Sequence, residues 1–75
     1  MRAKKEINIQ IGEQVKLARE HANLTQEQFA EKSGIPLFEI GMLESATGDP
    51  SLELLKRLAD SMEMELRISF VPVDR

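Results

Sequence analysis

The sequence contains no cysteine and a single histidine, His21, and these shortages exclude several classes of function. Without cysteine there is no disulfide framework and no thiolate metal site. No second histidine or carboxylate stands at metal-ligand spacing from His21, so we expect no metal site. The sequence also shows no arrangement of a nucleophile with a base and no glycine-rich phosphate loop. We therefore expect a protein that is not an enzyme and uses no cofactor.

Long apolar runs are also missing. None approaches the roughly 18 residues that a membrane-spanning helix requires. The basic segment Met1 to Lys5 is not followed by the continuous apolar stretch of a secretory signal. We expect a cytoplasmic protein with no membrane partner.

Basic residues are absent from one stretch of the chain. The formal net charge is -3, from 13 acidic and 10 basic residues. No lysine or arginine lies between Ser33 and Leu55, whereas four acidic residues do: Glu39, Glu44, Asp49 and Glu53. Charge alone therefore does not favour a nucleic-acid partner.

The length of 75 residues predicts a single domain over residues 1–75, and a hydrophobic content of 41% is enough for one compact core. A domain this small buries only about 60% of its unfolded surface and is marginally stable alone. We therefore expect dimerisation on size alone.

Apolar spacing predicts a mostly α fold, a bundle of four to five short helices over about residues 11–62. Spacings of four and three residues place Ile11, Val15 and Ala18 on one face of a first helix over about 11–22. Residues 6–11 alternate polar and apolar side chains, which predicts either a half-buried strand or a loose entry into this helix.

A helix-turn-helix is predicted over about residues 25–45. Thr25 and Gln28 form a capping-box pattern that begins a helix over about 26–32. Gly34 provides the positive φ of a tight turn, and a second helix follows over about 36–45. Such a unit needs a small side chain where its helices cross, glycine in its turn and two apolar side chains that hold its second helix. Residues of these types stand at the required spacing: Ala30, Gly34, Ile40 and Leu43.

The last helix and a strand complete the prediction. Ser51 caps a helix whose buried stripe consists of Leu52, Leu55, Leu58, Ala59 and Met62. Residues 64–71 then alternate, with Leu66, Ile68 and Phe70 on one face of a predicted strand. A lone strand with an unpaired edge invites aggregation. We expect it to pair with its twin across a dimer or with the N-terminal strand.

Residues 11–62 resemble the phage-repressor family of helix-turn-helix proteins (Cro and lambda-repressor-like, XRE-type). The matching segments are Ile11-Gly12-Glu13, Arg19, Leu24-Thr25-Gln26, Phe29-Ala30-Glu31-Lys32, Gly34-Ile35, Ile40, Leu43-Glu44, Pro50-Ser51-Leu52 and Leu58-Ala59. The strand-like tail is similar to that of small antitoxin-type relatives, in which this strand pairs across a dimer.

The resemblance implies a homodimeric, sequence-specific DNA-binding regulator, a repressor or antitoxin-like protein, whose second motif helix enters the major groove of operator DNA. It implies an ion pair of Arg19 with Glu44 that holds this helix, and a DNA contact by Gln26 at the edge of the site. It also implies a toxin or another protein as a candidate partner. The implied DNA-binding set is Gln26, Leu37, Phe38, Glu39, Met42, Thr47 and Ser51.

The sequence departs from the family on the face that reads bases. Leu37, Phe38 and Met42 stand where related repressors usually carry polar side chains, and apolar groups cannot hydrogen-bond base edges. Three interpretations remain open: weak or unusual DNA binding, a protein-interaction module that uses this apolar face, or burial of the face against a terminal strand. Ala46 also replaces the glycine usual after this helix, so the turn is expected to be reshaped around Gly48.

Overall fold

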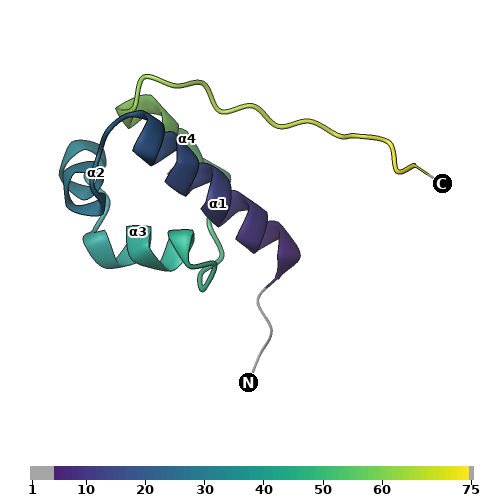
Figure 1. The fold of residues 1–75 in the computed structure, drawn as a ribbon, viewed down its shortest axis with the longest axis horizontal. Coiled ribbons are helices and arrows are strands. Elements are labelled where there is room, and N and C mark those ends of the chain that lie inside the picture. The colour runs from purple at the N-terminus through teal and green to yellow at the C-terminus, as the bar shows by residue number, and fades with distance from the viewer. Residues whose placement is uncertain (1–4, 75) are drawn as a thin grey trace.

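The computed structural model describes residues 5–74, which form four helices followed by an extended tail (Figure 1). The helices are α1 (Glu6–His21), α2 (Gln26–Ser33), α3 (Leu37–Glu44) and α4 (Leu52–Ser61). The expected mostly α class is confirmed. The described residues form four helices, where four to five were expected. In the described part of the chain no helix is long and apolar enough to cross a membrane.

The first helix begins earlier than predicted: of the two interpretations of residues 6–11, the strand is wrong and the entry into the helix is confirmed. Residues 6–11 belong to α1, whose buried face consists of Asn8, Gly12, Val15 and Arg19. These positions follow a helical spacing of four, three and four residues. Two of them are polar and one is glycine, so the apolar periodicity of the helix was hidden, while the exposed Ile7 and Ile9 produced a false alternation.

The predicted starts of α2 and α4 and the turn between the motif helices are confirmed. Thr25 Oγ1 accepts from the Gln28 backbone N–H at 3.0 Å, and Gln28 Oε1 accepts from the Thr25 N–H at 2.9 Å. Gly34 has φ +75°, a left-handed conformation that a Cβ would penalise. Ser51 Oγ accepts from the Leu54 N–H at 3.1 Å and so caps α4.

The core lies where α3 packs on α1 and α2 and where α4 packs on α2. Its centre consists of Val15, Phe29, Ile35, Ile40, Leu43 and Leu58. Full burial of such a side chain stabilises the fold by about 1.5–3 kcal/mol, so α3 is fixed mainly through Ile40 and Leu43. Sequence reasoning missed Ile35, which lies in the turn, and wrongly assigned Leu52 to the core, since it is 62% exposed.

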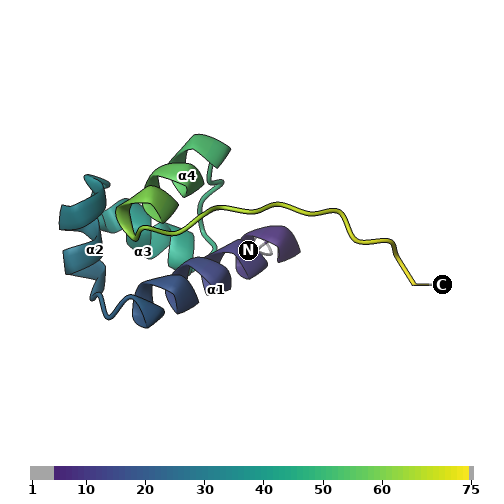
Figure 2. The same ribbon diagram turned by 90° about the horizontal axis from the view of Figure 1, so that it is seen from above.

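The tail over residues 64–74 is extended but forms no hydrogen-bonded strand among the residues that the structure describes. It leaves the end of α4 and runs past the N-terminal end of α1, away from the helices, in both views (Figures 1 and 2). Leu66 is half-buried, whereas Ile68 is 63% and Phe70 98% exposed. Pairing with an N-terminal strand is overturned, because residues 6–11 are helical.

Candidate nucleic-acid interface

A buried ion pair joins α1 to the end of α3. Arg19 Nε lies 2.7 Å from Glu44 Oε2, and Arg19 Nη2 lies 3.1 Å from Glu44 Oε1. The side chains are only 11% and 4% exposed. Arg19 Nη1 also donates to the Leu24 carbonyl at 2.7 Å. The hydrogen bond to Glu44 raises the pKa of Arg19 above its ordinary value, so the guanidinium stays charged in this buried position.

Gln26 extends this pair to the start of α2. Its side-chain amide donates to Glu44 Oε1 at 3.0 Å, so one carboxylate receives hydrogen bonds from α1 and α2. The sequence pointed to Gln26 as a DNA contact, and the structure adds an internal role: its side chain helps to fix α3 relative to α2. We refer to Arg19, Gln26 and Glu44 as the clamp.

The close approach of α1 to α3 depends on Gly12. A Cβ at this position would lie 2.6 Å from the Leu43 carbonyl oxygen and 3.0 Å from that of Glu44. These are backbone atoms, which cannot swing aside. Glycine is therefore required here by packing between two helices, at the same end of α3 that the clamp holds.

The loop between α3 and α4 is fastened to the first turn of α1. Asn8 Nδ2 donates to Asp49 Oδ1 at 2.8 Å and to the Gly48 carbonyl at 3.1 Å. Lys5 Nζ lies 3.4 Å from the same Asp49 oxygen. Ala46 itself adopts the left-handed conformation after α3, with φ 63°, so the expected substitution of Gly48 for the missing glycine is wrong.

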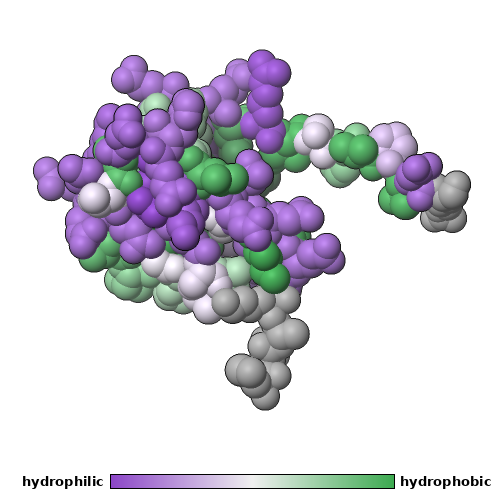
Figure 3. Space-filling model, in the orientation of Figure 1, coloured by the Kyte–Doolittle hydropathy of each residue, from purple (hydrophilic) through white to green (hydrophobic). Residues whose placement is uncertain are grey.

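The outward side of α3 exposes three large apolar side chains. Leu37, Phe38 and Met42 are 43%, 67% and 43% exposed, and an ideal Cβ on Gly41, between them, would meet nothing within 4 Å. Hydrophobic surface follows the edge of the molecule that α3 forms (Figure 3). The interpretation that a terminal strand buries this side is therefore overturned. We call Leu37, Phe38, Gly41 and Met42 the outer face.

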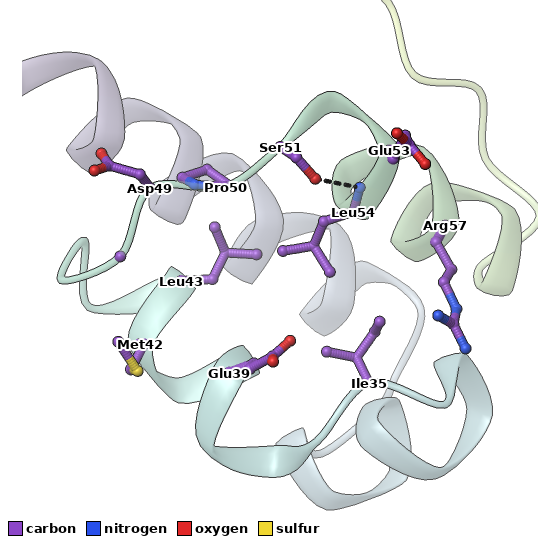
Figure 4. Close-up of a pocket in the computed structure, with 11 residues that line it drawn as sticks. Ile35, Glu39, Met42, Leu43, Asp49, Pro50, Ser51, Glu53, Leu54 and Arg57 are labelled. Carbon is purple, nitrogen blue, oxygen red and sulfur yellow. Dashed lines mark hydrogen bonds between the residues drawn. The ribbon is translucent and has the colours of Figure 1, made fainter.

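Glu39 lies at the edge of the outer face. It points into a groove of about 550 Å³ between α3, the following loop and α4, and Met42 lines the same groove (Figure 4). Ile35, Leu43 and Leu54 supply apolar lining to this groove. Its charged lining consists of Glu39, Asp49, Glu53 and Arg57. With three carboxylates to one guanidinium, the groove repels phosphate more than it attracts it.

Thr47 and Ser51, expected near phosphates, use their hydroxyl groups within the chain. Thr47 Oγ1 donates to the Met42 carbonyl at 3.2 Å and lies 3.0 Å from Ser45 Oγ. Ser51 caps α4. The Thr47 backbone N–H also donates to the Met42 carbonyl, at 2.9 Å. Of these two positions, therefore, only the helix start at Ser51 offers backbone N–H groups to a ligand.

No lysine or arginine stands between Ser33 and Leu55, but the fold brings cations from elsewhere in the described part of the chain close to α3. Lys5 is far from this region in sequence, yet it lies beside Asp49 in the loop that follows α3. Arg57 lines the groove and donates through Nε to the Ser33 carbonyl at 3.1 Å. The predicted basic N-terminal residues Arg2 and Lys4 lie outside the described residues.

Comparison with known proteins places the motif in a family. Residues 15–68 match the helix-turn-helix family HTH_3. No curated protein matches the sequence.

Two solved structures share the fold. A restriction-modification controller protein, C.AhdI from Aeromonas hydrophila, has a TM-score of 0.77 at 24% identity, over 81% of this chain and 92% of its own. An HTH_3 family transcriptional regulator from Vibrio cholerae has a TM-score of 0.75 at 24% identity over 77% of this chain. The match spans only 33% of that regulator.

Proposed function

The chain belongs to the HTH_3 helix-turn-helix family of DNA-binding transcriptional regulators, and from this premise we propose that it is a dimeric, sequence-specific repressor or antitoxin-like regulator. In this proposal α3 enters the major groove of operator DNA and presents Leu37, Phe38 and Met42 to the bases. Gln26, Glu39, Thr47 and Ser51 flank it, with the backbone N–H groups at the starts of α2 and α4 directed at phosphates. We place this activity in the cytoplasm.

The observation that carries the proposal is that α3 is fixed along one side and exposed along the other. Its inner side is fixed by buried Ile40 and Leu43 and by the clamp, while its outer face remains exposed. A helix held rigidly with one free side suits insertion into a groove about 12 Å wide. The apolar outer face is compatible with this role, since phosphate contacts supply much of the affinity and apolar side chains can contact base edges.

A salt series tests DNA binding. The full chain is titrated with a random-sequence duplex and with duplexes selected from a random pool, from low to physiological salt. We expect binding to be measurable at low salt. The logarithm of the binding constant should fall with the logarithm of the salt concentration along a shallow slope, because few cations surround α3. Lys5→Ala should reduce that slope by about 0.9, the value for one lost phosphate contact. Failure to bind any duplex at low salt would overturn the proposal.

The dimer is proposed from the tail. Apolar side chains alternate along an extended segment that has no partner strand among the described residues, and Leu66 and Ile68 line an apolar groove beside Leu52 of α4. A second copy of the tail would pair with this open edge. Leu66, Ile68 and Phe70 are the proposed contact residues.

Two variants test the dimer by molar mass in solution. Deleting residues 64–75 should give a monomer or insoluble protein. Replacing the exposed Ile68 and Phe70 with lysine should give a soluble monomer with unchanged helicity, because neither side chain supports the helical core. A dimer that persists in both variants would contradict pairing through the tail.

The antitoxin-like role and a toxin partner are proposed from the tail's similarity to antitoxin-type relatives. They predict that the neighbouring reading frame encodes a small protein that inhibits growth. Its product should copurify with this chain when the two are expressed together. A neighbour with no such effect would leave a repressor without a toxin.

A protein-interaction module on the same fold is the second candidate, because a specific observation favours it. Three large apolar side chains lie exposed together on α3 beside a groove with an acidic majority. Contiguous apolar surface of this kind commonly marks a protein contact. The salt series separates the two candidates, since only the regulator binds duplex DNA.

A further inference from the structure

The side chains of α3 offer no strong hydrogen-bond donor to a ligand. The helix reads Leu37-Phe38-Glu39-Ile40-Gly41-Met42-Leu43-Glu44, so its polar side chains are two carboxylates. Glu44 is held in the clamp and Glu39 points into the groove toward α4 (Figure 4). Ser45, which follows, donates its hydroxyl to the Met42 carbonyl at 3.1 Å. The outer face therefore presents hydrocarbon and a thioether.

This chemistry restricts what the outer face can distinguish in a major groove. A guanine edge carries only acceptors, so it requires donors that α3 lacks. An adenine edge carries an acceptor and a donor, and its usual partner is an amide side chain. Among the four bases, only thymine places an apolar group in the groove, its C5-methyl.

The shape of the outer face fits such a group. Phe38 and Met42 lie one helical turn apart on α3, and a Cβ on the adjacent Gly41 would meet nothing within 4 Å. A methyl group that projects from the groove floor can therefore approach the helix backbone at Gly41 beside these side chains. Leu37 extends the same apolar surface toward the start of the helix.

We infer that the outer face reads thymine methyl groups, so that Leu37, Phe38 and Met42 select DNA sites by the position of T·A pairs rather than by hydrogen bonds to bases. The inference rests on the proposed DNA-binding function. It assigns specificity to apolar contact and leaves affinity to the helix N-termini and peripheral cations.

Replacement of thymidine by deoxyuridine tests this directly, because it removes the C5-methyl and leaves base pairing unchanged. Short duplexes are first selected by the full chain from a random pool that contains thymidine. The enriched duplexes are then made again with deoxyuridine throughout the selected segment, and Kd is measured for both forms at one salt concentration. We expect Kd to rise about fourfold for each methyl group in contact, the effect of burying about one methylene.

Protein variants locate the contact. Phe38→Ala and Met42→Ala should bind the two forms of DNA with more nearly equal affinity, because the side chains that sense the methyl group are gone. Leu17→Ala is the matched control: Leu17 is an exposed leucine on α1, away from the outer face, and its loss should leave the preference for thymidine intact. Circular dichroism confirms that each variant is folded.

Three outcomes would overturn the inference, and they differ in what they leave standing. Equal, tight binding of thymidine and deoxyuridine duplexes would reject methyl readout while DNA binding stands. A thymidine preference that survives in both Phe38→Ala and Met42→Ala would assign it to another part of the chain. Absence of binding to any duplex would reject both the inference and the proposed regulator, and would favour a protein ligand for the outer face.

Discussion

The two sides of α3 differ in almost every physical property, although the helix has only eight residues. The inner side carries Ile40 and Leu43, both buried, and ends in Glu44, which the clamp holds. The outer face is exposed and apolar. Packing and hydrogen bonding dictate the first side, whereas nothing in the described part of the chain dictates the second. The fold therefore explains the inner side, and the outer face is the side that we propose contacts a ligand.

The largest effect on stability is expected from breaking the clamp. Glu44→Ala leaves the Arg19 guanidinium buried without its carboxylate and removes the acceptor of the Gln26 amide. Loss of one partner of a buried pair costs about 3–5 kcal/mol. For a domain of this size about 3 kcal/mol lowers Tm by more than 10 °C.

Thermal unfolding measures this effect, and Glu53→Ala is the control. Glu53 is an exposed carboxylate in the first turn of α4, so its removal should change the free energy of unfolding by less than about 1 kcal/mol. Similar Tm values for the two variants would mean that the clamp contributes no more than a surface charge does.

The next largest effect concerns the contact of α1 with α3. Gly12→Ala places a Cβ 2.6 Å from the Leu43 carbonyl oxygen, so the two helices must separate. Overpacking of this kind costs about 1–3 kcal/mol, which exceeds the roughly 1 kcal/mol that alanine gains over glycine within a helix. We expect a net loss of stability in chemical denaturation. A variant more stable than the parent would show that the helices separate at little cost.

The contrast between the two sides of α3 also explains which features the sequence could predict. The capping box at Thr25, the positive φ at Gly34 and the inward positions of α3 follow local rules of spacing and backbone geometry, and all were found. The N-terminal part of α1 was left open between strand and helix because its buried face includes Asn8, whose partners Gly48 and Asp49 lie 40 and 41 residues away in sequence. Periodicity of apolar residues does not report such partners.

The candidate site was predictable in outline only. The sequence placed the outer-face residues on α3, but their exposure depended on whether a terminal segment covers them. It also placed Glu39 beside them, although one residue of difference rotates a side chain by 100° around a helix, here into the groove. The position of Lys5 beside Asp49 follows from the fold, since the two residues are far apart in sequence.

A smaller effect of opposite sign is expected at the second helical glycine. An added Cβ on Gly41 meets nothing within 4 Å, in contrast to Gly12. Gly41→Ala should therefore raise stability by up to about 1 kcal/mol, since glycine is unfavourable in a helix interior. Denaturant midpoints for Gly12→Ala and Gly41→Ala should shift in opposite directions. Shifts of the same sign would mean that helix propensity, rather than the side on which the glycine lies, decides the outcome.

The smallest effect on stability is expected from Phe38, and it makes the sharpest test of the comparison. The Phe38 side chain is 67% exposed, so little of its apolar area is removed from water on folding. Phe38→Ala should change the free energy of unfolding by less than about 0.5 kcal/mol, as surface substitutions usually do. Its affinity for selected duplex DNA should fall all the same, because in the proposed complex that area is buried against the bases. If unfolding and DNA binding are both unchanged in Phe38→Ala, the outer face is not the surface that meets DNA.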